Sequence, residues 1–326
     1  MTFGRTMALA ALLLALPGEA ASLGLAEPMR TLNGGVFNHQ CVVVNNVLYV
    51  ISQKGYVAWS KLGGDGDLGP WGYAANLFPE GMGQNYFCAA AWLDRIYVMG
   101  GDQSALVVMA RAKPDGSLEP WKKTTALPEP RFYGAAVAVG GQLYYVGGQY
   151  HRRVFHARIL GDGGIGEWKE TERLPANRYG MQVFSHGGYL YVVGGTAIKP
   201  VDTVFRSKLK ADGSLEKWRR TEPLPEPRSG YGGVVAGEDV FVFGGALGND
   251  AELTTSAVAT TIGADGHFSA WRELPWLPMA ACGLQAVRWR NWIYVVGGIT
   301  LKEGGNTVWN TVWRYRIEEK TQKGEP

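Results

Sequence analysis

The sequence has few cysteines, the residues that cross-link small exported proteins, and no strong excess of the positive charge that binds nucleic acid. Its 326 residues contain three cysteines, Cys41, Cys88 and Cys282, which is an odd number. All three fall among small apolar neighbours on predicted strands, so we expect buried thiols rather than a disulfide framework. Lysine and arginine number 32 against 29 acidic residues, and no basic run is longer than a pair. This balance argues against nucleic acid as a partner.

Long apolar runs are also missing, apart from one near the amino terminus. Met7 to Leu16 follow Arg5, and small residues around Ala20 come next. This pattern is typical of a secretory signal peptide, and the run is too short to span a bilayer comfortably. We therefore expect a signal peptide over residues 1–20 and a secreted or periplasmic protein with no membrane span. The alternative is an uncleaved interfacial anchor.

Motifs for catalysis and for metal binding are sparse. No pair among the five histidines has metal-ligand spacing, and no nucleophile elbow or ordered Ser/His/Asp set is visible. We predict no cofactor and no metal. The histidines are His39, His151, His156, His186 and His267.

What the sequence does have is a repeat. Asp-Gly followed by four residues and Trp recurs five times, and a short apolar run ending in a glycine pair recurs in step with it. The two markers have a period near 50 residues, which is typical of a radial array of small sheets. The Asp/Trp pairs are Asp65/Trp71, Asp115/Trp121, Asp162/Trp168, Asp212/Trp218 and Asp265/Trp271.

Each repeat predicts four antiparallel strands. In residues 131–170 the first strand is rich in small residues, as an innermost strand requires, and the last carries the large Trp168 at the wider radius. Asp162-Gly163 predicts the hairpin turn between the third and fourth strands, with both central residues at positive φ. The fold class is therefore all-β: a six-bladed propeller with four strands in each blade.

The last repeat lacks its outer strand, and the missing strand is predicted at the other end of the chain. Residues 22–32 have the same spacing to the next inner strand as Ser117 to Leu127. We expect them to complete the last blade and close the ring, which removes an exposed sheet edge. The propeller then covers residues 21–319, and residues 320–326 form a C-terminal tail.

The apolar run, glycine pair and spaced Trp resemble the kelch repeat over residues 22–317. The family's Tyr on the third strand is present only as Tyr315. The resemblance implies a propeller with binding loops on one face. Exported kelch proteins include sialic-acid mutarotases (N-acetylneuraminate epimerases), and kelch-type oxidases resemble galactose oxidase. Tyr150-His151 is superficially similar to the adjacent Tyr and His of those copper enzymes, but no clear second His accompanies it.

Arginines mark the start of three consecutive inner strands. Arg131, Arg178 and Arg228 are predicted on the face that carries the longest loops, and three convergent guanidinium groups would bind a carboxylate or phosphate. Nearby aromatic residues are predicted to stack on a sugar or peptide. The alternative is that each arginine pairs with a loop carboxylate, such as Glu129 or Glu226, and braces the blades. The remaining candidate ligand-binding residues are Tyr86, Tyr133, Tyr179, Tyr231, Tyr150 and His151.

These patterns favour a non-catalytic binding module for an anionic sugar, peptide or protein partner. The alternative function is a mutarotase for an acidic sugar, which requires a general acid or base near the anomeric carbon. Glu80 and His39 are the only candidates for that role. No catalytic residue is predicted.

Overall fold

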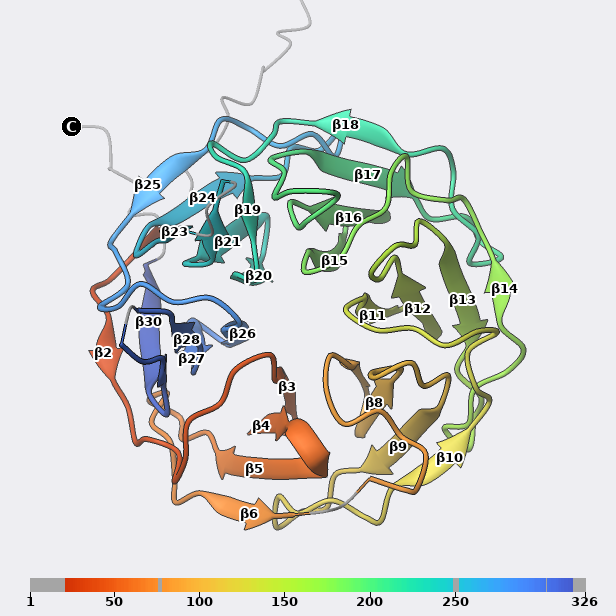
Figure 1. Cartoon of the computed structure of the whole chain (residues 1–326), viewed down its shortest axis with the longest axis horizontal. Helices are drawn as coiled ribbons and strands as arrows, with labels where there is room; N and C mark the ends of the chain where they lie inside the picture. Colours follow the sequence, from red (N-terminus) through yellow and green to blue (C-terminus); the bar gives the residue numbers. More distant parts are fainter. Residues whose placement is uncertain (1–20, 76–77, 249–251, 303, 319–326) are drawn as a thin grey trace, which may run out of the picture.

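The computed structural model describes residues 21–75, 78–248, 252–302 and 304–318. The predicted signal peptide (1–20) and C-terminal tail (320–326) lie outside these residues. Within them, six antiparallel sheets are arranged as a ring around a central axis, as Figure 1 shows. The propeller predicted from the repeat is confirmed. The sheets are named blades 1 to 6 in chain order, starting with the sheet that contains β3.

The strands of each blade run from the axis to the rim. Blade 1 has β3 (Gln40–Val44), β4 (Val47–Ser52), β5 (Tyr56–Lys61) and β6 (Gly72–Ala74). Blade 2 has β7 (Cys88–Trp92), β8 (Arg95–Met99), β9 (Val107–Arg111) and β10 (Lys122–Thr124). Blade 3 has β11 (Ala135–Val139), β12 (Gln142–Val146), β13 (Val154–Arg158) and β14 (Lys169–Glu170).

The other half of the ring follows the same order. Blade 4 has β15 (Gln182–His186), β16 (Tyr189–Val193), β17 (Val204–Lys208) and β18 (Arg219–Thr221). Blade 5 has β20 (Gly232–Ala236), β21 (Asp239–Phe243), β24 (Ala257–Thr261) and β25 (Arg272–Leu274). Blade 6 has β26 (Gln285–Trp289), β27 (Trp292–Val296), β30 (Val312–Glu318) and, outside them, β1 (Ser22–Leu23) and β2 (Glu27–Pro28).

The ring is closed by the amino-terminal strands, as predicted. Leu23 of β1 pairs with Ile317 of β30, and Pro28 of β2 pairs with Trp313. The innermost strands also contact one another in cyclic order, and β26 of blade 6 packs against β3 of blade 1. The Leu23 side chain is buried in the apolar cluster between blades 5 and 6. Closure thus combines backbone pairing with hydrophobic packing.

The glycine pairs allow each blade to approach the next. At the end of β12, Gly147 and Gly148 have φ of 63° and 109°. A Cβ on Gly147 would lie 2.5 Å from the carbonyl oxygen of Arg178, and the Gly148 N–H donates to that same oxygen at 2.9 Å. A side chain at Gly147 would therefore push blade 4 away from blade 3. In blade 1 the pair is replaced by Ser52 and Gln53, where a short 3₁₀ helix (Gln53–Gly55) follows β4.

The Asp-Gly turns form as predicted, although their backbone differs from the expected type. At Asp162-Gly163 only the glycine has positive φ, 90°. The Asp162 carboxylate accepts a hydrogen bond from the Gly164 N–H at 2.8 Å, which holds the aspartate backbone outside the left-handed region. The glycine carbonyl then joins two blades. The Tyr97 hydroxyl of blade 2 donates to the Gly163 oxygen at 2.9 Å.

This tyrosine–glycine bond recurs around the ring. In blades 2, 3, 4 and 6 the second residue of the apolar run supplies the hydroxyl, and the Asp-Gly turn of the following blade supplies the carbonyl. The other pairs are Tyr144 with Gly213, Tyr191 with Gly266 and Tyr294 with Gly66. Blade 1 has Tyr49 at this position, but its buried hydroxyl has no partner among the described residues.

The three cysteines are unpaired. Cys41 and Cys88 are buried on inner strands, and burial raises the pKa of their thiols well above the usual range. Cys282 is half-buried and lies three residues ahead of β26 rather than on it. The predicted preference for unpaired thiols over disulfides is confirmed.

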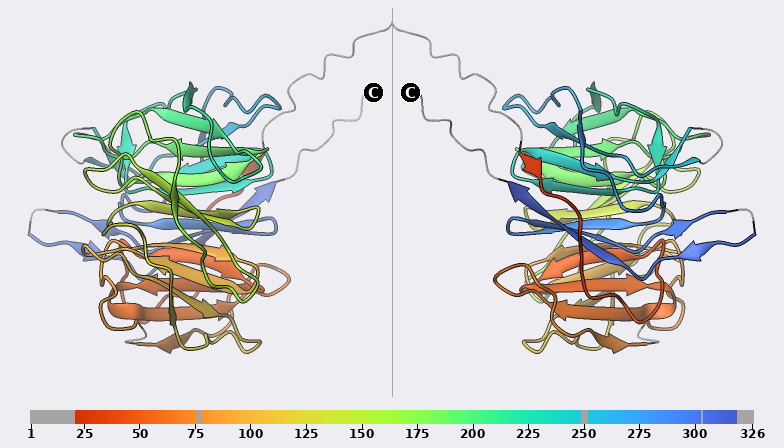
Figure 2. Two further views of the ribbon diagram at one scale, coloured as in Figure 1. Left: turned by 90° about the vertical axis from the view of Figure 1, so that its right-hand side faces the viewer. Right: turned by 90° about the vertical axis from the view of Figure 1, so that its left-hand side faces the viewer.

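The longer loops gather on one face of the ring. The hairpin of β28 (Ile299–Thr300) and β29 (Thr307–Val308) projects from this face in Figure 2, whereas β1 begins and β30 ends on the opposite side. In blade 5, β22 (Ala246–Leu247) pairs with β23 (Glu252–Leu253) and with β19 (Arg228–Ser229) ahead of the inner strand. The loop-rich face therefore also holds the segments that lead into the inner strands.

Candidate functional site

The loop-rich face carries one unusual backbone position in every blade. Two residues before each inner strand, the chain enters the left-handed region, with φ between 48° and 65°. The residues are Asn38, Tyr86, Tyr133, Gly180, Gly230 and Gly283. Left-handed backbone is ordinary for glycine and tolerated by asparagine, but it costs a tyrosine about 1–2 kcal/mol. Two strained tyrosines thus occupy positions where other blades use glycine.

These six residues form a chain of hydrogen bonds around the mouth of the central channel. The N–H of each residue donates to the carbonyl of its counterpart in the preceding blade. The bonds run from Tyr133 to Tyr86, Gly180 to Tyr133, Gly230 to Gly180, Gly283 to Gly230, and Asn38 to Gly283, with lengths from 2.6 to 3.2 Å. No sixth bond from Tyr86 to Asn38 is recorded within the described residues. This ring of six left-handed residues, called the collar, is therefore interrupted between blades 1 and 2.

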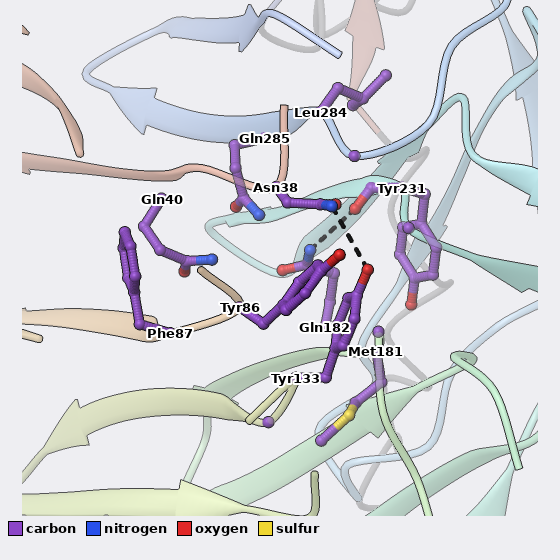
Figure 3. Close-up of a pocket in the computed structure, with 14 residues that line it drawn as sticks. Asn38, Gln40, Tyr86, Phe87, Tyr133, Met181, Gln182, Tyr231, Leu284 and Gln285 are labelled. Carbon is purple, nitrogen blue, oxygen red and sulfur yellow. Dashed lines mark hydrogen bonds between the residues drawn. The ribbon is translucent and has the colours of Figure 1, made fainter. Parts of the chain in front are cut away.

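Side chains cover only half of this collar. The rings of Tyr86 and Tyr133 stack with their centroids 4.1 Å apart. The Asn38 amide donates to the Tyr133 hydroxyl at 3.4 Å, which joins blade 1 to blade 3 across the stacked pair. Figure 3 shows these three side chains together at the pocket. On the other half, the glycines of blades 4 to 6 add no side chain to the collar, and the mouth is lined there by Met181, Tyr231 and Leu284.

Three glutamines lie below the collar. Gln40, Gln182 and Gln285 come two residues after the left-handed position and line both the mouth and the channel beneath it. Gln182 donates to the Tyr231 carbonyl at 2.9 Å, and Gln40 accepts the Ala89 N–H at 3.3 Å. The cavity at the mouth is about 70 Å³ and the one below it about 170 Å³. Both are smaller than the roughly 300–1,000 Å³ of pockets that enclose a whole ligand.

The mouth is polar but uncharged. None of the described residues that line its cavity is a carboxylate or a cation. Burial raises the pKa of the Tyr133 phenol, so the hydroxyl stays protonated at neutral pH. The amides and phenols can donate and accept hydrogen bonds, and the stacked rings offer an aromatic face.

The three predicted arginines do not reach the mouth. Arg131, Arg178 and Arg228 are buried, with 0%, 2% and 1% of their surface exposed, and none lines the channel cavities. The Arg178 guanidinium donates to the Gly194 carbonyl at 2.8 Å and to the Thr203 hydroxyl at 3.0 Å, both in its own blade. Burial lowers the pKa of all three guanidinium groups.

The other two arginines are held similarly. Arg228 donates to the Ser256 hydroxyl at 2.7 Å, and Arg131 pairs with Glu129. The guanidinium of Arg131 also lies 5.3 Å from the ring centre of Phe155. Arg131 and Arg228 pair with Glu129 and Glu226, as the bracing alternative predicts, whereas Arg178 is held by a carbonyl and a hydroxyl. The three arginines do not form a convergent anion site. The physical reason is that the backbone enters the left-handed φ region two residues after each arginine. This turn directs the arginine side chain back into its own blade and places the left-handed residue near the axis.

The predicted aromatic residues divide into two groups. Tyr86, Tyr133 and Tyr231 line the mouth, although the Tyr231 hydroxyl donates inward to the Val193 carbonyl at 2.5 Å. Tyr179 is half-buried beside Tyr133, with ring centroids 5.8 Å apart. Tyr150 is 75% exposed on the loop between β12 and β13, and neither it nor His151 lines the channel cavities. The structure therefore does not bring Tyr150 and His151 to this site.

His39, one of two acid/base candidates, is fully buried between blades. Neither ring nitrogen has a hydrogen-bond partner among the residues that the structure describes, and burial lowers the pKa of the histidine to about 3. The ring packs against the backbone of Gly297, where a Cβ would lie 3.0 Å from His39 Cε1. A histidine with this pKa is neutral and a weak base near pH 7. The other candidate, Glu80, is exposed and does not line the channel mouth.

The sequence predictions omitted Asn38 and the three glutamines. A signal for the collar is nevertheless present in the sequence. Aligning the repeats places Asn38, Tyr86 and Tyr133 in one column with three glycines, a combination that indicates positive φ. A tyrosine in a glycine column marks a strained position, and strained positions concentrate at functional sites.

Two further observations concern the described part of the chain. It holds no group of three or more histidine, cysteine or acidic side chains placed to bind a metal ion. It also contains no helix with the length and hydrophobicity needed to cross a bilayer.

Comparison with known proteins bears on the fold. No protein-family model matches the sequence, and no curated protein matches it. Solved structures that match include YjhT, with a TM-score of 0.63 and 16% sequence identity, over 86% of this chain and 99% of that one. At this identity the similarity supports the fold and carries no information on the ligand.

Proposed function

We propose that this protein is an exported, kelch-type propeller that binds an uncharged, hydroxyl-rich part of a glycan at the channel mouth, without catalysing a reaction. The observation that carries the proposal is the strained, stacked pair Tyr86 and Tyr133, bridged by the Asn38 amide. Aromatic faces stack on the apolar faces of sugars, and amides bind their hydroxyls.

The dimensions of the channel favour recognition of a ligand's end. A cavity of about 70 Å³ admits a small substituent, while the rest of the ligand rests on the loop-rich face. The free side of the collar, formed by Gly180, Gly230 and Gly283, leaves room for it. The arginines predicted to select an anion are buried, so the proposal shifts from an anionic ligand to a neutral one.

Sialic-acid mutarotation is the second candidate, suggested by the resemblance to exported kelch proteins. It requires an acid or base near the anomeric carbon. The uncharged lining of the mouth and the low pKa of His39 favour the binding module.

The test combines two tyrosine substitutions with a matched control. Tyr86→Gly and Tyr133→Gly replace strained tyrosines with the residue used by the opposite blades. Tyr150→Gly makes the same change at another left-handed tyrosine (φ 65°), which is exposed and outside the mouth. Binding of methyl glucoside, N-acetylglucosamine and N-acetylneuraminic acid is measured by saturation-transfer NMR and calorimetry.

We expect the wild type and Tyr150→Gly to bind a neutral sugar equally. The double Tyr86/Tyr133 variant should lose at least about fivefold in affinity, since stacking contributes about 0.5–1.5 kcal/mol per aromatic contact. Equal binding by all variants would contradict the proposed site. Anomeric equilibration of N-acetylneuraminic acid is followed by NMR in the same samples, and acceleration by the wild type would favour the mutarotase.

A further inference from the structure

The outermost strand of blade 6 begins without an Asp-Gly turn, because it comes from the amino-terminal end of the chain. Blade 5 therefore faces the segment that leads into β1, where other blades face a turn. Its central strand changes accordingly. Phe241 replaces the tyrosine that would donate to a turn carbonyl, and an aspartate, Asp239, stands two residues before it.

Asp239 is buried, with 8% of its surface exposed, and it contacts the first described residue of the chain. Its Oδ2 accepts a hydrogen bond from the backbone nitrogen of Ala21 at 3.1 Å. Its Oδ1 accepts the Thr261 hydroxyl at 2.7 Å and lies 3.5 Å from the Arg272 guanidinium. Arg272 also donates to the Ala21 carbonyl oxygen. The nitrogen and the oxygen of Ala21 are thus both held by charged groups.

We infer that Ala21 is the first residue of the mature protein and that its free ammonium group forms an ion pair with the buried carboxylate of Asp239. The sequence before Ala21 fits this cleavage position. Gly18 and Ala20 are small residues at the third and first positions before the bond, as signal peptidases require. Cleavage one residue later would place Glu19 at the third position.

The chemistry of the step is simple hydrolysis. One water molecule adds across the Ala20–Ala21 peptide bond, leaving a carboxylate on Ala20 and an ammonium on Ala21. An uncleaved chain offers Asp239 a neutral N–H, whereas the cleaved chain offers a positive charge at the same atom. Charge-assisted hydrogen bonds are about twice as strong as neutral ones.

Other charges around the site are compatible with this pair. Arg272 repels the ammonium, but its guanidinium is directed at the Ala21 oxygen and at Oδ1. On the strand side, the Glu318 carboxylate accepts the Ser22 hydroxyl at 2.8 Å and adds a second negative charge nearby. Because β1 closes the ring, the ion pair would stabilise the closing strand only after the protein is exported and the Ala20–Ala21 bond is cleaved.

The stability test uses two forms of the chain. One begins at Ala21, released from a ubiquitin-like fusion that leaves no extra residue, and the other carries one additional glycine before Ala21. Both contain the entire closing strand, but only the first places an ammonium at Asp239. Each form is made as wild type, Asp239→Asn and Glu238→Gln, the last being an exposed neighbour that controls for the loss of one charge.

We expect the form that begins at Ala21 to melt about 2–4 °C higher than the extended form in the wild type and in Glu238→Gln. This difference should vanish in Asp239→Asn. Equal melting of the two wild-type forms, or a difference that survives in Asp239→Asn, would overturn the ion pair.

Processing is tested separately. The full chain is exported with its own leader and its intact mass is measured. A mass starting at Ala21 supports the proposed cleavage, and any other start, or retention of residues 1–20, overturns it.

Discussion

The Asn38 amide donates to the Tyr133 hydroxyl at 3.4 Å, although the two residues belong to blades 1 and 3. Tyr86 of blade 2 stacks on Tyr133 between them. Three consecutive blades therefore build one wall of the channel mouth, while blades 4 to 6 contribute glycines. A fold with sixfold pseudo-symmetry thus presents an asymmetric site.

Substitution of Tyr133 should affect stability less than its central position suggests. Tyr133→Gly relieves a left-handed tyrosine, worth about 1–2 kcal/mol, and loses a stacking contact of about 0.5–1.5 kcal/mol. The free energy of unfolding should change by less than about 1 kcal/mol, measured by urea denaturation. Tyr133→Ala keeps a Cβ in the left-handed region and should be less stable than Tyr133→Gly. The reverse order would contradict the strain.

Arg178 should be structural. Arg178→Ala removes a buried guanidinium that pairs with the Gly194 carbonyl and Thr203, and leaves that carbonyl without its partner. The free energy of unfolding should fall by about 1–3 kcal/mol, because the buried carbonyl loses its hydrogen bond. Arg152→Ala, at an exposed arginine, is the control. Sugar affinity of the folded Arg178 variant should equal that of the wild type, whereas a loss of affinity would restore a direct binding role.

The tyrosine–glycine bonds between blades can be tested by comparing two identical substitutions. Tyr144→Phe leaves the buried Gly213 carbonyl without its 2.7 Å hydrogen bond and should cost about 1–2 kcal/mol. Tyr49→Phe removes a buried hydroxyl that has no partner in the described part of the chain, so it should be neutral or stabilising. Denaturant titrations of both variants decide the matter. Equal costs at the two positions would show that the bond contributes nothing.

Ring closure predicts a sharp difference between neighbouring leucines. Leu23 is 5% exposed between blades 5 and 6, so Leu23→Ala should lower the free energy of unfolding by about 2–3 kcal/mol. Leu25 is 77% exposed, and Leu25→Ala should have almost no effect. Thermal and denaturant unfolding measure both. A Leu23 variant as stable as the Leu25 variant would mean that the strand does not lock the ring.

His39 should make the fold sensitive to acid. Its folded pKa of about 3 lies below the ordinary value of 6.5, so the unfolded chain binds the extra proton between these values. Stability should therefore fall as the pH drops from about 6.5 toward 3. His39→Phe, which copies the equivalent Phe87, should raise the melting temperature more at pH 4.5 than at pH 8. His186→Phe is the control, and an equal gain at both pH values would contradict the linkage.

Much of the fold could be predicted from the sequence because its determinants are local and repeated. Asp162-Gly163 marks a hairpin, Trp168 marks the outer strand, and the glycine pairs mark blade contacts, each by its own backbone or volume requirement. The number of repeated markers indicates the missing outer strand, because six inner strands accompany only five Asp-Gly/Trp segments. The type of turn differs from the prediction, since the Asp162 side chain holds its own backbone outside the left-handed region. Cys282 lies ahead of its predicted strand.

The candidate site could not be predicted to the same extent. A repeat determines where a residue lies along its strand, but it does not determine the direction in which the side chain points. Arg131 and Tyr133 are two residues apart, yet the left-handed turn at Tyr133 sends one into the blade and the other into the channel. The ring and its closure follow from the local, repeated signals of the sequence. The tertiary structure decided which residues meet at the axis, because that contact joins blades about 50 or more residues apart through a few backbone angles.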